Sequence, residues 1–215
     1  MTALTRRATI AGAAAGAAVM VAPAGAAVKA APGDMNLGSP KAPVHVVEYL
    51  SLTCPHCAHF HEQVFPAFKK KYIDTGRVYF TIRELLTAPA NVAAAGFLMA
   101  RCNGGARYFQ VVDQVFKSQS RWQPGAPIKP IFVEIAKANG MTEAQFEACI
   151  TDEKASQALE ARLEYATQTD KVTSTPTFFV NGAMLPGQDV PTLADLDAAI
   201  AKARKPAPGK TGGRR

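Results

Sequence analysis

The sequence predicts an α/β fold in which a block of helices interrupts a sheet. Segments rich in β-branched and aromatic residues, which favour strands, lie at 44–50, 78–83 and 176–180. Residues 54–73 instead place their apolar side chains at helical spacing, and nearly every segment between 89 and 170 does the same. The pattern therefore predicts a β-α-β unit, a helical block and a return to strand.

The β-α-β unit begins with the strand VHVVEYL at 44–50 and ends with the strand VYFTIR at 78–83. Between them, apolar residues recur at helical spacing at Phe60, Val64, Phe68 and Tyr72. Pro66 should kink this helix because proline lacks a backbone N–H and crowds the preceding turn. A unit of about 40 residues has the size of a parallel crossover, so the two strands are expected to pair in parallel.

Turns that contain glycine or proline divide the helical block into segments. The predicted helices cover residues 92–101, 108–116, 131–138, 142–150 and 155–167. After them come a strand at 176–180, a hairpin turn at Asn181-Gly182 and a helix that starts at Thr192, a favourable N-cap. This order predicts a thioredoxin fold at 40–87 and 170–203, with an inserted all-helical subdomain at 88–169.

The net charge of +7 comes from the two ends of the chain. Of the 24 basic residues, two are Arg6 and Arg7 and six lie from Lys202 onward, which leaves 16 against 17 acidic residues. The folded part therefore has no basic excess to neutralise phosphates, which argues against nucleic acid as a partner. Residues 204–215, rich in Pro, Gly and basic residues, are expected to form a disordered tail.

Residues 1–27 have the features of a signal peptide. Arg6 and Arg7 precede an apolar run, and small residues near Ala24-Gly25-Ala26 offer a cleavage site. Paired arginines before an Ala- and Gly-rich run suit a twin-arginine signal, and an ordinary secretory signal is the alternative. We expect the mature protein to be soluble outside the cytoplasm, where disulfides form and persist.

Two cysteines separated by two residues stand where the first strand passes into the helix, as Cys54-Pro55-His56-Cys57. At the helix N-terminus the Cys54 sulfur faces unpaired N–H groups and the positive end of the helix dipole, both of which favour a thiolate. Cys57, one turn further, should lie within bonding distance and be more shielded. Pro55 suits the first turn, which needs no N–H from it. The His56 ring can lie next to the Cys54 sulfur and favour the thiolate further.

A stabilised thiolate makes the Cys54–Cys57 disulfide an acceptor of electrons, so we expect the protein to oxidise the dithiols of other proteins. We expect no cofactor or metal besides this redox-active disulfide. The alternative is a copper or zinc site that joins the two cysteines to nearby histidines. Otherwise His59 and His61 are expected to be exposed helix residues.

Two further positions are candidates for the site. Glu48 lies mid-strand, where its carboxylate is either exposed at an edge or buried beneath the cysteines. If it is buried, its pKa rises and it can take the proton of Cys57. Pro176, after Thr175, either simply starts the third strand or forms a cis bond that turns the Thr175 backbone toward an extended substrate.

Taken in order, these features resemble the DsbA family of periplasmic thiol:disulfide oxidoreductases over about residues 40–203. Cys-Pro-His-Cys is that family's characteristic active-site sequence. Arg83-Glu84 and the segments 99–102 and 108–122 are similar to the branch of the family found in alphaproteobacteria. Thr175 stands where the best-known enterobacterial member has valine, a difference expected to affect substrate preference and redox strength.

The site residues that the resemblance implies are the nucleophile Cys54, its partner Cys57, the buried acid Glu48 and Pro176 as a cis-proline. It also implies a second, non-catalytic disulfide between Cys102 and Cys149, two reduced buried cysteines being the alternative. Exported proteins with free cysteines would be the substrates, and a DsbB-type membrane protein linked to quinone would reoxidise the site.

The function that follows is that of a monomeric periplasmic dithiol oxidase. A disulfide isomerase or reductase with the same cysteines is the alternative. Known isomerases carry an added dimerisation domain, and few residues separate the expected cleavage site from the first predicted strand. We therefore favour the oxidase.

Overall fold

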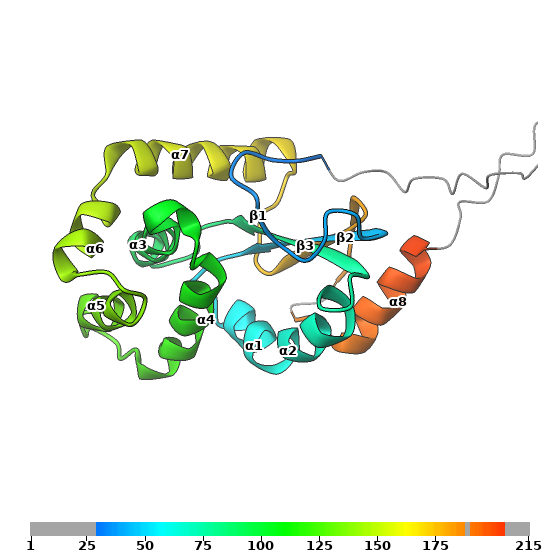
Figure 1. The fold of residues 1–215 in the computed structure, drawn as a ribbon, viewed down its shortest axis with the longest axis horizontal. Helices are drawn as coiled ribbons and strands as arrows, with labels where there is room; N and C mark the ends of the chain where they lie inside the picture. Colours follow the sequence, from blue (N-terminus) through cyan, green and yellow to red (C-terminus); the bar gives the residue numbers. More distant parts are fainter. Residues whose placement is uncertain (1–28, 188–189, 205–215) are drawn as a thin grey trace, which may run out of the picture.

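The computed structural model describes residues 29–187 and 190–204, so the predicted signal peptide and nearly all of the predicted tail lie outside it. The described chain forms a mixed sheet with helices on both faces and a block of helices beyond one end (Figure 1). The strands are β1 Met35–Leu37, β2 Val44–Leu50, β3 Val78–Glu84, β4 Thr177–Val180 and β5 Ala183–Met184, in the order β1-β3-β2-β4-β5. The predicted thioredoxin fold with inserted helices is confirmed.

β2 and β3 form the centre of the sheet as the predicted parallel pair, with Val44 opposite Val78. β4 pairs antiparallel with β2, so that Tyr49 lies opposite Thr177. Nearly every residue of β2 and β3 is buried, because helices cover both faces of the sheet. Alternate side chains of β2 therefore enter two separate layers of the core.

The first strand along the chain is one that the sequence pattern did not predict. β1 pairs antiparallel with β3, with Met35 opposite Ile82. The sheet therefore begins before residue 40, the predicted start of the thioredoxin part. A strand of three residues is too short to show an alternation of apolar and polar side chains.

One face of the sheet is covered by α1 Pro55–Gln63, α2 Phe65–Phe68, the π-helical turn η1 Lys69–Ile73 and α8 Leu193–Arg204 (Figure 1). The predicted helix 54–73 is thus in three pieces. The break comes at Val64, where φ is −112°, and Pro66 lies in the first turn of α2. The kink expected at Pro66 is confirmed, because the proline has no N–H with which to continue α1.

The insertion consists only of helices. They are α3 Ala90–Arg101, the 3-10 turn η2 Cys102–Gly105, α4 Tyr108–Ser118, the 3-10 turn η3 Gln119–Arg121, α5 Lys129–Ala138, α6 Glu143–Ile150, α7 Glu153–Glu164 and the π-helical turn η4 Tyr165–Thr169. α7 lies over the second face of the sheet (Figure 1). A disulfide joins Cys102, after α3, to Cys149 in α6, with the two Cα atoms 6.0 Å apart.

None of the helices in the described ranges is both long and apolar enough to span a bilayer.

The predicted hairpin connects β4 and β5. Asn181 and Gly182 both have positive φ, 46° and 79°, as the tight turn between two antiparallel strands requires. The cap predicted at Thr192 is also present. Its hydroxyl accepts from the Asp195 N–H at 3.2 Å, and the Asp195 carboxylate accepts from the Thr192 N–H at 2.9 Å.

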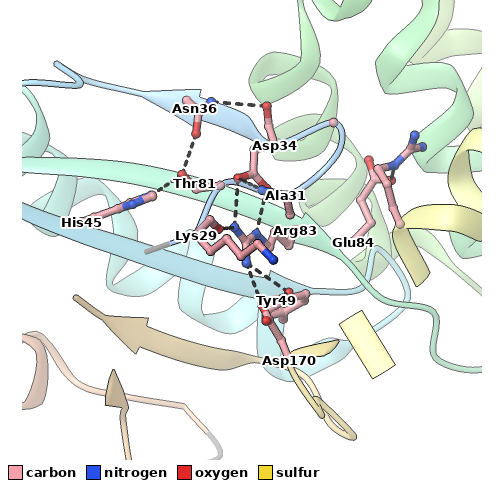
Figure 2. A network of polar contacts seen from close by, with 12 residues as sticks. Lys29, Ala31, Asp34, Asn36, His45, Tyr49, Thr81, Arg83, Glu84 and Asp170 are labelled. Atoms are coloured by element: carbon pink, nitrogen blue, oxygen red, sulfur yellow. Dashed lines mark hydrogen bonds and ion pairs between the residues drawn. The ribbon is translucent and has the colours of Figure 1, made fainter. Parts of the chain in front are cut away.

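A network of polar contacts around Arg83 fastens two distant segments to the sheet (Figure 2). Arg83, on β3, is only 6 % exposed and forms ion pairs with Asp34 at 2.7 Å and Asp170 at 2.6 Å. Its guanidinium also donates to the Tyr49 hydroxyl and to the Lys29 carbonyl oxygen. Arg83 thereby holds the segment before β1 and the segment that leads to β4.

Candidate active site

Cys54 lies where β2 leads into α1. It caps the helix, with an extended backbone at φ −82° and ψ 118°, and its Sγ accepts from the Cys57 backbone N–H at 3.4 Å. Pro55 follows in the first turn, where helices do not need the N–H that proline lacks. The sulfur therefore faces the unpaired N–H groups and the positive end of the α1 dipole.

Hydrogen bonds lower the pKa of the Cys54 thiol from 9.0 to about 5. The largest contribution is the bond from the Cys57 thiol, and burial works in the opposite direction. The Thr175 side chain and the backbone N–H groups of Cys57 and His56 lower the pKa further. In the reduced site, Cys54 is therefore a thiolate at neutral pH.

The His56 side chain is exposed, and the group of this residue that bonds to the Cys54 sulfur is the backbone N–H. A protonated ring would act on the thiolate as a neighbouring positive charge. This contribution of the ring stays a prediction.

Cys57 is fully buried, whereas Cys54 is 6 % exposed. Burial raises the pKa of the Cys57 thiol well above 9.0, and the neighbouring Cys54 sulfur and Glu48 carboxylate raise it further. Both cysteines are free thiols here. The arrangement makes Cys54 the sulfur that another molecule can reach, while Cys57 can react only with its neighbour.

β4 brings Thr175-Pro176 next to Cys54, because its antiparallel pairing with β2 sets Thr177 opposite Tyr49. The peptide bond between Thr175 and Pro176 is cis, and the Cys54 sulfur lies 3.3 Å from the Thr175 carbonyl oxygen, to which it can donate only when it is a protonated thiol. The Thr175 hydroxyl is buried and makes no hydrogen bond of standard geometry with the described residues. It is therefore available to the Cys54 thiolate.

Glu48 is fully buried in the middle of β2. Of the two alternatives for this carboxylate, exposure at a sheet edge or burial, the structure shows burial. Its Oε2 lies 2.9 Å from Nε2 of His61, and burial raises its pKa. The expectation that His61 is exposed is wrong, since the side chain lies on the sheet-facing side of α1, four residues after Cys57. His59, on the other side of the helix, is exposed as expected.

Residues that the sequence did not single out hold the turn between β2 and α1. Gln119 donates from its amide to the carbonyl oxygen of Leu52 at 2.9 Å and to that of Cys54 at 3.5 Å. Three hydroxyls also contact one another beneath the turn, those of Ser51, Thr53 and Thr87. No local pattern marks these residues, because Gln119 and Thr87 reach the turn only through tertiary packing.

In residues 29–187 and 190–204, no three His, Cys, Asp or Glu side chains are grouped as metal ligands. His61, one of the histidines considered as a ligand, is instead bonded to Glu48. The alternative of a copper or zinc site thus has no ligand set in this part of the chain.

A family model described as thioredoxin matches residues 30–202. Two Rickettsia relatives are named as protein-disulfide oxidoreductases. The protein of Rickettsia bellii is 33% identical over 173 residues, 80% of this chain and 66% of that protein. The protein of Rickettsia typhi is 33% identical over 162 residues, 75% of this chain and 59% of that protein. The chain thus spans less than two thirds of the length of these relatives.

Solved structures show the same fold. The crystal structure of Wolbachia pipientis alpha-DsbA1 has a TM-score of 0.72 and 29% identity, over 81% of this chain and 92% of that chain. Oxidised BdbD of Bacillus subtilis has a TM-score of 0.68 and 21% identity, over 78% and 91% of the two chains. The chain therefore belongs to the thioredoxin family, and within it to the DsbA proteins.

Proposed function

We propose that this protein is a thiol:disulfide oxidoreductase that introduces disulfides into exported proteins. The observation that supports this most directly is the opposite shift of two neighbouring thiol pKa values, lowered to about 5 for Cys54 and raised for Cys57. A stabilised Cys54 thiolate stabilises the reduced site. The disulfide form is then a strong acceptor of electrons.

The reaction begins when a substrate thiolate attacks Sγ of Cys54 in the disulfide. The bond between Cys54 and Cys57 breaks, a mixed disulfide forms, and Cys57 leaves as a thiolate that takes up a proton. A second substrate thiolate then attacks the substrate sulfur of the mixed disulfide, and Cys54 leaves as a stabilised thiolate. The substrate loses two electrons and gains a disulfide, and the site gains the two electrons without any further cofactor.

Two neighbours assist these steps. Glu48, a buried carboxyl of raised pKa, exchanges the proton with Cys57. The backbone of Thr175 pairs with an extended substrate segment, and its contact with Cys54 supports this role, because a segment bound there lies beside the reacting sulfur.

We further propose that the protein acts as a monomer in the periplasm. The signal-like features of residues 1–27 and the similarity to DsbA proteins support this location. A DsbB-type membrane protein that passes electrons to quinone would regenerate the disulfide. Proteins with free cysteines that are still folding would be the substrates.

Equilibration of Cys54 and Cys57 with glutathione buffers tests the proposal. We expect an equilibrium constant typical of an oxidant, and rapid oxidation of a reduced, unfolded substrate protein by the disulfide form. A constant typical of a reductant would instead support the reductase alternative. Cys54→Ser is the inactive control for these measurements. Comparing the metal content of this variant with that of the unaltered protein tests the copper or zinc alternative.

A further inference from the structure

The carboxylate of Glu48 is enclosed by apolar groups on both sides within the sheet. Glu48 lies opposite Ile82 on β3 and opposite Phe178 on β4, and all three residues are buried. One carboxylate oxygen, Oε2, lies 2.9 Å from His61 Nε2. The other, Oε1, is buried without a hydrogen-bond partner among the described residues. Glu48 therefore has one oxygen on His61 and one free to exchange a proton.

The His61 ring is packed among aromatic side chains. Its centroid lies 4.8 Å from the ring centroids of both Phe65 and Phe116, and the Phe60 ring meets it edge-on at 5.5 Å. Glu48 is therefore the polar group that hydrogen-bonds to Nε2 of His61 within this aromatic packing. His61 keeps 6 % exposure, whereas Glu48 has none. Of the two residues, His61 is the one that reaches solvent.

The proposed reaction requires proton transfer at a place that water does not reach. Cys57 is fully buried, and it gains a proton each time the disulfide is reduced and loses one each time it re-forms. Glu48 raises the pKa of Cys57 electrostatically, but it is itself fully buried. A carboxyl that exchanges a proton with Cys57 must therefore exchange it again with something nearer to solvent.

We propose that His61 carries protons between Glu48 and solvent and so completes a relay from Cys57 through Glu48 to His61. This inference rests on the proposed function. On reduction, the Cys57 thiolate takes the proton of Glu48, His61 returns a proton to Glu48, and water reprotonates His61. On reoxidation each transfer runs in reverse, and the proton leaves through the ring. Since His61 acts through Glu48, it is a positioning residue and does not touch the reacting sulfur.

The surroundings leave few other routes for this proton. β3 and β4 present Ile82 and Phe178 to Glu48, and neither can titrate. Besides Cys57, the titratable groups among the described residues that influence the Glu48 carboxyl electrostatically are His61 and Cys54. Cys54 remains a thiolate in the reduced site, so His61 is the group that can exchange a proton with Glu48 repeatedly.

The experiment isolates the step that needs the proton of Cys57. Reduced protein is mixed with oxidised glutathione, and the mixed disulfide is followed by acid quench and mass spectrometry. Its formation depends on the Cys54 thiolate, and its decay depends on deprotonation of Cys57. His61→Gln keeps a hydrogen-bonding group but cannot carry a proton, and His59→Gln is the same change at an exposed position of the same helix.

We expect His61→Gln to slow the decay at least about tenfold and to leave the formation rate unchanged. The decay rate should then rise steeply with pH, because hydroxide must replace the relay, whereas the unaltered protein should show a flatter profile. Glu48→Gln should slow the decay similarly, and the double variant should be no slower than Glu48→Gln alone. His59→Gln should behave as the unaltered protein.

An unchanged decay rate in His61→Gln, or equal slowing in His59→Gln, would overturn the relay. If His61→Gln does not fold, the unaltered protein still gives an answer through the infrared difference between its oxidised and reduced forms. The relay predicts that carboxyl and imidazole bands change together, and a spectrum without imidazole bands would contradict it. The glutathione equilibrium of the unaltered protein tests the proposed function separately, since it does not depend on the rate of proton transfer.

Discussion

The carbonyl oxygen of Thr175 lies 3.3 Å from Sγ of Cys54, so the segment before β4 meets the start of α1 at the reacting sulfur. The same residue lowers the pKa of Cys54 through its side chain. Thr175 therefore both borders the place where a substrate would bind and stabilises the thiolate.

Thr175→Val should raise the pKa of Cys54. The substitution keeps the shape of the side chain and the carbonyl contact but removes the hydroxyl available to the thiolate, and losing one hydrogen bond should raise the pKa by about one unit. Thiolate absorbance as a function of pH measures it. Thr167→Val, at an exposed threonine of the insertion, is the control and should leave the pKa unchanged.

His56→Ala should also raise the pKa of Cys54, because it removes a ring that can be positively charged beside the thiolate while keeping the backbone N–H. His59→Ala removes another exposed ring further along α1 and should have no effect. The same absorbance titration compares the two. Equal pKa values in both variants would show that the backbone alone acts on the sulfur.

The reduced protein should gain stability relative to the oxidised protein as the pH rises. The pKa of Cys54 falls from 9.0 in the unfolded chain to about 5 in the folded one. The stabilisation is therefore complete above about pH 9 and is lost as the pH falls to about 5, at about 1.4 kcal/mol per pH unit for one proton. Urea unfolding of both forms across this range measures it, and parallel curves would contradict the assigned pKa.

Arg83→Ala should lower the free energy of unfolding by about 3–5 kcal/mol, because it leaves the carboxylates of Asp34 and Asp170 without their buried partner. Arg121→Ala breaks an ion pair with Glu134 in which both side chains are more than half exposed, so solvent screens the pair and its loss should change stability little. Urea unfolding of the two variants compares them. Similar losses would show that the Arg83 network is not a buried one in solution.

Replacing both Cys102 and Cys149 by Ala should lower the free energy of unfolding by about 2–4 kcal/mol, because the disulfide closes a loop across 47 positions of the chain. The pKa of Cys54 should not change, since neither residue is among the groups that shift it. Unfolding and thiolate titration of the same variant separate the two effects. A shifted Cys54 pKa would show that the insertion is coupled to the site.

Local signals accounted for most of the fold. β2, β3 and the turn at Asn181-Gly182 were predictable because side-chain preference and turn chemistry act over a few neighbouring residues. The placement of Cys54 at the start of a helix followed for the same reason. β1 was not predictable, because its three residues carry no pattern.

The interior of the site was less accessible to sequence reasoning. The burial of Glu48 stayed open because a strand alone does not reveal what covers it. The exposure predicted for His61 was wrong because a polar side chain usually faces solvent, and only the position of α1 against the sheet brings the ring to Glu48. Gln119 reaches the active-site turn from another helix, which no local pattern encodes.

Titration of thiolate absorbance in the reduced protein shows whether Cys54 is held as a thiolate. With Cys57 still protonated throughout the range, we expect one transition with its midpoint near pH 5. A single midpoint near the ordinary cysteine value of 9.0 would contradict it.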